Sequence, residues 1–282
     1  MDKERGNHTT KLLCKVMRVH PSGYYKWRKR GITPSQERRN KLLKRIKEIF
    51  KESRETYGCP RIHPQLISEG FRCSYNTIET LMRKNKIQPK QKRRFKATTD
   101  SKHTMPIAPN VLSREFTVDE PDEVWVSDIT YIWTAQGWLY LCVFIDLYSR
   151  AVVGWSMSNN MTADFVVDAF KMGVGKRGRA PLVLHSDRGS QYASNLFRDE
   201  IALYDCIQSM SRKGDCWDNA VAESFFGTLK QELVYRKFYK SRIEATMDIF
   251  DYVEIFYNKR RRHSALKYLT PEEKEQKEKK VA

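Results

Sequence analysis

The sequence has 282 residues, of which 40% are hydrophobic and 12% aromatic, so it can form one large folded domain or two smaller ones. No run approaches the ~20 apolar residues that a membrane span requires, and the N-terminus leads into no apolar signal core. These features argue against a membrane protein or a secreted protein. We expect a soluble cytoplasmic protein with no membrane partner.

The net charge of +18 is concentrated in the first third of the chain. Residues 1–100 contain 27 Lys and Arg against 9 Asp and Glu, whereas residues 101–282 contain 25 of each. A basic segment joined to a neutral remainder is typical of a polyanion-binding module attached to a second domain. The alternative is a basic face that only favours solubility.

The six cysteines and six histidines are scattered along the chain. They form no CxxC or HxxxH pair and no zinc-finger spacing. We therefore expect reduced, mostly buried thiols and no structural zinc site.

The basic third has a helical pattern. We expect an N-terminal helical segment over residues 1–35, with a helix, a turn at 21–23 and a second short helical piece at 24–27. Residues 36–95 predict a helix-turn-helix DNA-binding domain, with helices near 37–50 and 62–69 and a turn at 70–73. Its last helix begins after Ser74 as N-cap, which puts Asn76 and Thr77 on the first turn, where they would approach bases. A three-helix bundle with a basic surface remains the alternative.

A short basic run closes this region. Lys92, Arg93 and Arg94 would track DNA phosphates, and residues 96–115 read as a basic linker.

After residue 111 the pattern changes to strands alternating with helices. We expect strands at residues 125–131, 138–145, 151–156, 182–186 and 207–210. Helices are expected at residues 162–172, 195–203, around Glu223 and at 243–257. This order predicts an α/β fold with a mixed five-stranded sheet and flanking helices, followed by a charged tail over residues 272–282 that frays.

Three acids carry the chemistry that we predict. Asp128 lies in an apolar strand, Asp187 directly follows another, and Glu223 is on a helix. Carboxylates supplied by two strands and one helix can hold a pair of hard divalent cations, and such pairs cleave or join phosphodiesters. Taken singly, each acid could be a surface or capping residue.

Other acids compete for a role. Asp146 also ends an apolar run, although it equally suits the first position of a turn, and Asp215 and Asp218 suit a cap for the helix of Glu223.

Basic residues flank the three acids. Lys230 lies seven positions after Glu223 and so shares its helix face, where it would meet a phosphate or remain solvated. Arg188 follows Asp187, while Arg212 and Lys213 belong to a basic loop before the helix of Glu223. We expect these four side chains to contact DNA.

Several motifs together resemble the DDE transposases of bacterial insertion sequences, specifically the second-reading-frame protein of the IS-three type. They occur in order along nearly the whole chain: SGYYKW at 22–27, YGCPRI at 57–62, WVSDITY at 125–131, HSDRGSQY at 185–192, DNAVAESFFGTLK at 218–230, YN at 257–258, RH at 262–263 and TP at 270–271.

The resemblance implies an RNase H-like, integrase-like catalytic core, which we assign to residues 116–271. It implies Asp128, Asp187 and Glu223 as catalytic ligands of two Mg²⁺ (or Mn²⁺) ions and Lys230 as a contact to element-end DNA. The implied activity is cleavage at the terminal inverted repeats followed by strand transfer into target DNA, that is, DNA integration and recombination. No nucleotide cofactor is implied.

The resemblance also implies partners. The active enzyme of this type is usually a frameshift fusion with the product of an upstream reading frame, and joining two DNA ends calls for a homo-oligomer on the nucleoid. The zinc-binding N-terminal module of retroviral integrases is not recognisable here.

Two other functions remain open on sequence grounds. One is a purely hydrolytic nuclease with the same fold. The other is a DNA-binding regulator of transposition with an inert RNase H-like core.

Overall fold

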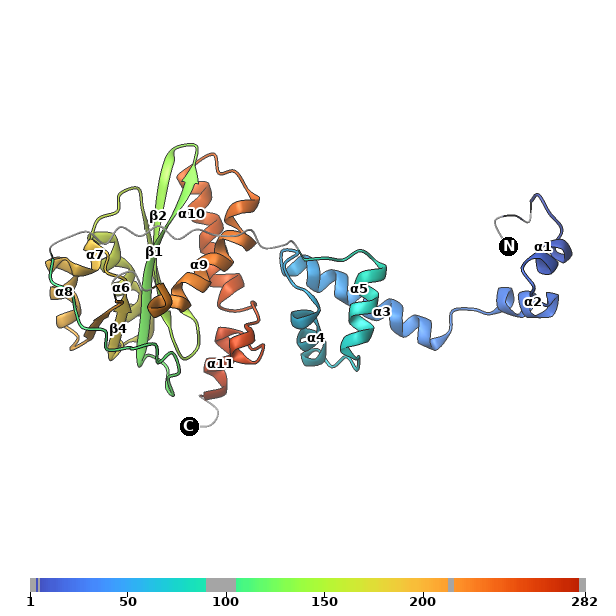
Figure 1. The fold of residues 1–282 in the computed structure, drawn as a ribbon, viewed down its shortest axis with the longest axis horizontal. Helices are drawn as coiled ribbons and strands as arrows, with labels where there is room; N and C mark the ends of the chain where they lie inside the picture. The colour runs from blue at the N-terminus through green and yellow to red at the C-terminus, as the bar shows by residue number, and fades with distance from the viewer. Residues whose placement is uncertain (1–3, 5, 90–104, 213–215, 279–282) are drawn as a thin grey trace. The chain divides into compact units, whose positions relative to one another are not determined.

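The structure is a computed structural model that describes residue 4 and residues 6–89, 105–212 and 216–278. The chain divides into two compact units, residues 1–89 and residues 90–282, and each has its own architecture (Figure 1).

The first unit is helical throughout its described elements. Its helices are α1 (Thr10–Val16), α2 (Pro21–Lys29), α3 (Pro34–Glu52), α4 (Cys59–Ser68) and α5 (Tyr75–Lys84). The turn expected at residues 21–23 is wrong, because α2 begins at Pro21. Proline suits the first helical position since it lacks an N–H that the helix could not satisfy there.

Helices α3, α4 and α5 share one apolar core. Ile46, Ile62, Leu66 and Ile78 are completely buried. The Ser74 side chain accepts a hydrogen bond from the Thr77 N–H and caps α5, as predicted. These three helices confirm the helix-turn-helix-like region.

An ion-pair hub fastens α3 to the end of α4. Arg45 contacts Glu48 and Glu52 on its own helix, and its Nε lies 2.6 Å from an oxygen of Glu69, the C-cap of α4.

The second unit is built on a five-stranded mixed sheet. Its strands are β1 (Val124–Thr134), β2 (Gly137–Asp146), β3 (Val152–Ser158), β4 (Val183–Ser186) and β5 (Ile207–Met210), in the spatial order β3-β2-β1-β4-β5. The first three strands pair antiparallel, whereas β1–β4 and β4–β5 are parallel. The predicted mixed sheet and its strand count are confirmed.

Helices flank this sheet, as Figure 1 shows. On one side lie α6 (Asp164–Arg177), α7 (Ser190–Ala193) and α8 (Asn195–Ala202); on the other lie α9 (Ala220–Glu232), α10 (Arg242–Phe250) and α11 (Pro271–Glu278). Short 3₁₀ turns η2 (Cys216–Asn219), η3 (Val234–Arg236) and η5 (Ser264–Leu266) connect elements of the second half.

Aromatic side chains fill the core between the sheet and α6–α8. Trp125, Phe144, Phe170 and Phe197 are fully buried and contact one another. Strand β3 meets α6 so closely that a Cβ on Gly154 would lie 2.2 Å from the Ala169 carbonyl oxygen.

The helix expected over residues 243–257 changes type part-way. Helix α10 ends at Phe250, and a π-helix, η4 (Asp251–Tyr257), follows it. The Asn258 N–H donates to the Val253 carbonyl and the Arg261 N–H to the Phe256 carbonyl, each five residues back. An α-helix and a π-helix share similar apolar stripes over so short a length, so the pattern did not distinguish them.

The described part of the charged end does not fray, contrary to our expectation. It forms α11, in which Glu275 pairs with Arg177 at 3.0 Å and the Lys274 Nζ lies 3.7 Å from the centre of the Tyr148 ring. Long charged side chains hold this helix against the core.

Candidate active site

Asp128 lies in the middle of β1, opposite Val143 of β2, and is half-buried. Its Oδ1 accepts a hydrogen bond of 2.7 Å from the Ile129 N–H. Burial, and next the charge of Asp187, raise the pKa of Asp128 well above its usual value, and Glu223 raises it further. The negative charges of both other predicted acids therefore act on this carboxylate.

The strand register explains why Asp128 and Asp187 are neighbours. Val126 of β1 pairs with His185 of β4 in a parallel ladder. Asp128 comes two residues after Val126 on β1, and Asp187 comes two residues after His185, directly beyond the end of β4, so both acids follow the same pair. The Asp187 Oδ1 accepts a hydrogen bond of 2.9 Å from the Gly189 N–H, which fixes the carboxylate at the end of β4.

Glu223 is on the first turn of α9 and is exposed. Within the described residues, however, no three His, Cys, Asp or Glu side chains are gathered closely enough to hold a metal ion. The structure thus brings Asp128 of β1 and Asp187 at the end of β4 to neighbouring positions, and the charges of Asp187 and Glu223 both act on Asp128, but the described residues form no closed set of three ligands.

Lys230 is buried, with only 4% of its surface exposed. Its Nζ lies 5.0 Å from the centre of the Tyr131 ring. Burial lowers the pKa of Lys230, and the negative charge of Asp128 opposes that shift. The amine therefore lies over an aromatic face and within electrostatic range of Asp128.

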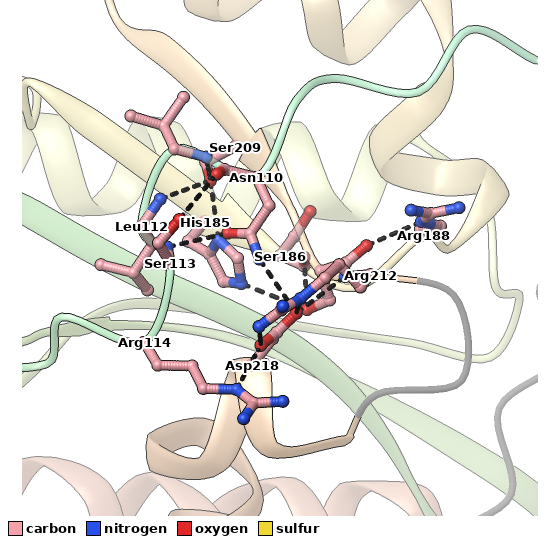
Figure 2. Close-up of polar contacts among 12 residues, drawn as sticks. Asn110, Leu112, Ser113, Arg114, His185, Ser186, Arg188, Ser209, Arg212 and Asp218 are labelled. Carbon is pink, nitrogen blue, oxygen red and sulfur yellow. Dashed lines mark hydrogen bonds and ion pairs between the residues drawn. The ribbon is translucent and has the colours of Figure 1, made fainter.

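Asp218 does not cap α9, contrary to the expectation from sequence, and Asp215, the other acid expected there, falls outside the described residues. It is fully buried and accepts hydrogen bonds from Asn110 at 2.9 Å, from Arg114 Nε at 2.9 Å, and from the backbone and guanidinium of Arg212 (Figure 2). These contacts, led by Arg212, hold the pKa of Asp218 well below its usual range. The Asp218 carboxylate, just before the helix that carries Glu223, is thus joined to residues 110–114 and to Arg212.

The next residue ties this junction to β1. The Asn219 Nδ2 donates to the Ser127 carbonyl at 2.9 Å. Asp218 and Asn219 together fix the start of α9 next to the strand segment that presents Asp128.

His185, two residues before Asp187, belongs to a second group of hydrogen bonds near the site. Its ring nitrogens lie 2.8 Å from the Ser209 Oγ and 3.1 Å from the Ser211 Oγ (Figure 2). Burial lowers the pKa of His185 to about 4, so the ring is neutral at physiological pH. The Ser209 hydroxyl also accepts from the Val111 and Leu112 N–H groups, which fastens the entry segment of this unit to β5.

Asp146 serves as a turn residue and not as a member of the acid cluster. It is fully buried, and its carboxylate accepts hydrogen bonds from the Ser149 N–H, the Ser149 hydroxyl and the Asp122 N–H. Of the two roles that the sequence left open for Asp146, the structure shows the turn position.

The predicted DNA-contact residues are divided among several places. Arg188 donates to the Ser211 carbonyl at 2.7 Å, and Arg212 pairs with Asp218, so both lie beside the site. Asn76 is exposed on the first turn of α5, and the Thr77 hydroxyl lies 2.9 Å from the Ser74 hydroxyl. The remaining four predicted contacts, Lys92, Arg93, Arg94 and Lys213, fall outside the described residues.

Comparison with known proteins places this architecture in a family. Residues 118–216 and residues 204–271 each match a family described as Integrase core domain, and residues 37–95 match one described as HTH-like domain. The chain is 37% identical over 280 residues to the transposase InsF for insertion sequence IS3A of Escherichia coli (strain K12), an alignment that covers 98% of this chain and 97% of that one. This chain belongs to the IS-three family of insertion-sequence transposases.

A second relative of this transposase is the uncharacterized 31 kDa protein of insertion element IS600 from Shigella sonnei, which is 40% identical over 260 residues, covering 92% of this chain and 96% of the other. Among solved structures, the HTLV-2 integrase catalytic core domain in complex with magnesium aligns at 19% identity and a TM-score of 0.41, covering 54% of this chain and 95% of that one. The BIV integrase catalytic core domain aligns at 17% identity and a TM-score of 0.42, covering 57% of this chain and 99% of that one.

The expected family, the mixed-sheet integrase core and the preceding helix-turn-helix-like region are therefore confirmed for this transposase. No helix in the described part of the chain is long and apolar enough to cross a membrane.

Proposed function

We propose that this IS-three transposase is a polynucleotidyl transferase that cleaves DNA at the ends of its element and joins the freed strand to another DNA. The three acids Asp128, Asp187 and Glu223 carry the reaction in this proposal. The supporting observation is the like-charge contact between Asp128 and Asp187 at the end of β4.

The acid pair suits a hard divalent cation. The negative charge of Asp187 raises the pKa of Asp128, so the two carboxylates repel each other. A bound Mg²⁺ or Mn²⁺ ion would offset that repulsion, and such ions prefer oxygen ligands. We assign Asp128, Asp187 and Glu223 as the residues that hold two such ions. When bound, the ions supply an activated attacking oxygen and charge stabilisation for the leaving one.

Glu223 completes the ligand set in this proposal by a local movement. It is exposed on α9, and its side chain can exchange rotamers at little cost. The Asn219 contact with the Ser127 carbonyl keeps the start of the helix beside β1, so the proposed movement is one of the Glu223 side chain.

Basic side chains orient the DNA. Lys230, next to Asp128, would contact the phosphate beside the scissile bond, while Arg188 and Arg212 lie beside the site, where they can reach neighbouring phosphates. Lys213 would add a further contact.

The N-terminal unit would bind the terminal inverted repeats. In our proposed layout, residues 1–35 form a helical segment, 36–95 the DNA-binding domain, 96–115 a linker and 116–271 the catalytic core, followed by the tail at 272–282. Asn76 and Thr77 on α5 would approach bases, and Lys92, Arg93 and Arg94 would follow phosphates. Binding of two element ends and a target on the nucleoid calls for a homo-oligomer and for fusion or association with the upstream reading-frame product.

Replacing Glu223 with Gln tests the assignment. The Glu223→Gln variant should bind end DNA as the parent does, but it should neither nick that DNA nor join pre-cut ends. The control is Glu272→Gln, which changes an exposed acid of α11 and should leave nicking and joining intact. Cleavage by Glu223→Gln would refute the site. Joined products from pre-cut ends in the parent protein would exclude a purely hydrolytic nuclease.

One observation favours the regulator as a second candidate. The described acids do not form a closed three-ligand group. A regulator with an inert core would occupy the element ends and produce neither nicks nor joined strands with Mg²⁺ or Mn²⁺.

A further inference from the structure

Three exposed aromatic side chains gather at the hairpin of β1 and β2. Tyr131, Trp133 and Trp138, the hairpin aromatic cluster, keep 39%, 54% and 43% of their surfaces exposed. The Trp138 ring centre lies 4.9 Å from that of Tyr131 and 4.7 Å from that of Trp133, both edge-to-face. Such packing orders the rings while leaving large apolar surfaces in water, which is characteristic of a binding surface.

The cluster adjoins the active site through Lys230. Side chains alternate along β1, so Tyr131 and Asp128 start from opposite faces of the strand. The pairing of β1 with β4 ends at Val126, so neither Asp128 nor Tyr131 is paired with a residue of β4. Lys230 interacts with both, through the Tyr131 ring at 5.0 Å and through the charge of Asp128, so the two faces meet around one buried amine.

A second cation supports the tip of the hairpin. The Arg242 Nε donates to the Trp138 carbonyl at 3.1 Å, and the Arg242 N–H donates to the Gln136 side chain at 3.0 Å. A Cβ on Gly137 would come within 3.2 Å of an Arg242 nitrogen, so glycine at this turn, with φ of 97°, permits the close contact. The aromatic surface is thus bordered by Lys230 on one side and by Arg242 at the tip.

We propose that the hairpin aromatic cluster stacks an unpaired nucleobase of the DNA strand whose phosphate meets Lys230. This inference rests on the proposed function, because the reacting phosphodiester is what brings DNA to Asp128. Aromatic rings bordered by cations suit the bases and the phosphates of a single strand. A protein partner seated on these rings would obstruct the approach to the acids.

The test compares two oligonucleotides of equal charge. The full chain carrying Glu223→Gln, which should bind without cleaving, is titrated with single-stranded oligo-dT and with an abasic oligonucleotide of the same length. We expect oligo-dT to bind about tenfold more tightly, with quenching of tryptophan emission. Trp138→Ala should remove that preference and leave abasic affinity unchanged. Tyr131→Ala should also remove the preference, whereas Tyr131→Phe should retain it.

Tyr204→Ala is the matched control. Tyr204 is 40% exposed, but it packs on Phe170 beside α6, so its loss should leave the preference intact. Equal affinity of the parent for the two oligonucleotides, or an equal loss of both affinities in Trp138→Ala, would overturn the inference. So would a change in oligomeric state with the base preference preserved, because the cluster would then join copies of the chain.

The cleavage assay separates this inference from the proposed function. Cleavage by the parent protein without any base preference would leave the function standing and remove the stacking role. A base preference that depends on Tyr131 in a protein that never cleaves would support the stacking surface and refute the proposed function.

Discussion

Asp187 raises the pKa of Asp128, although the two residues come from different strands. The parallel register of β1 and β4 produces this contact, since each acid lies two residues beyond the Val126–His185 pair. Negative charges held this way oppose folding of the metal-free protein and favour cation binding.

Removing one of these charges should therefore stabilise the metal-free protein. We predict that Asp187→Asn raises the free energy of unfolding by about 1 kcal/mol without divalent cations. The parent should gain further stability from Mn²⁺, and the variant should not. Thermal unfolding with and without Mn²⁺ measures both effects, and Asp199→Asn, an exposed acid of α8, is the control. An Mn²⁺ response that survives in Asp187→Asn would contradict the ligand role.

Lys230→Met should impair DNA binding and leave folding intact. Methionine can fill the buried space and keep contact with Tyr131 but removes the cation. Loss of one phosphate contact should reduce the salt dependence of binding to end DNA, the slope of log K against log salt, by about 1. Lys267→Met, at an exposed position after η5, should preserve the parent slope. An unchanged slope in Lys230→Met would refute the phosphate contact.

The Asp218 junction makes a prediction about stability and pH. Asp218→Asn should cost about 1–3 kcal/mol at pH 7, because it weakens the charge-assisted hydrogen bonds from Arg114 and Arg212. The pKa of Asp218 is lower in the folded protein than in the unfolded chain. Its contribution to stability is therefore complete above about pH 4 and declines as the pH falls further.

Chemical denaturation at pH 7 and at pH 3 checks the sign. The difference in unfolding free energy between parent and Asp218→Asn should narrow at the lower pH. A gap that widens on acidification would mean that the carboxylate is not stabilised in its ionised form.

The contact of β3 with α6 gives a prediction about packing. Gly154→Ala should destabilise the protein by about 1–3 kcal/mol, because the new Cβ would lie 2.2 Å from the Ala169 carbonyl oxygen and 2.7 Å from the Gly173 nitrogen. Gly175→Ala on the exposed side of α6 meets nothing within 4 Å and should stabilise by about 0.5–1 kcal/mol. Equal unfolding midpoints for the two variants would refute the close packing.

The sequence predicted elements with strong local patterns. The apolar runs that became β1 and β2 and the Ser74 cap of α5 were recognisable because their signals lie within a few residues. The apolar run also predicted a strand that ends just before Asp187, and the structure confirms this position directly after β4.

Contacts between distant segments were not predictable in this way. Asp218 meets Arg114, 104 residues earlier in the chain, and no spacing rule connects them. The interaction of Lys230 with Tyr131 likewise depends on how α9 crosses β1. Local pattern carries no information about such tertiary pairs, so the sequence suggested a helix cap for Asp218 and left a solvated Lys230 open, whereas the structure buries both side chains.

The most direct test of the account is to locate Mn²⁺ by anomalous diffraction in crystals of this transposase bound to element-end DNA. We predict metal peaks held by carboxylate oxygens of Asp128, Asp187 and Glu223. Crystals in which DNA is bound but the metal lies elsewhere, or in which Glu223 remains turned away from it, would contradict the account.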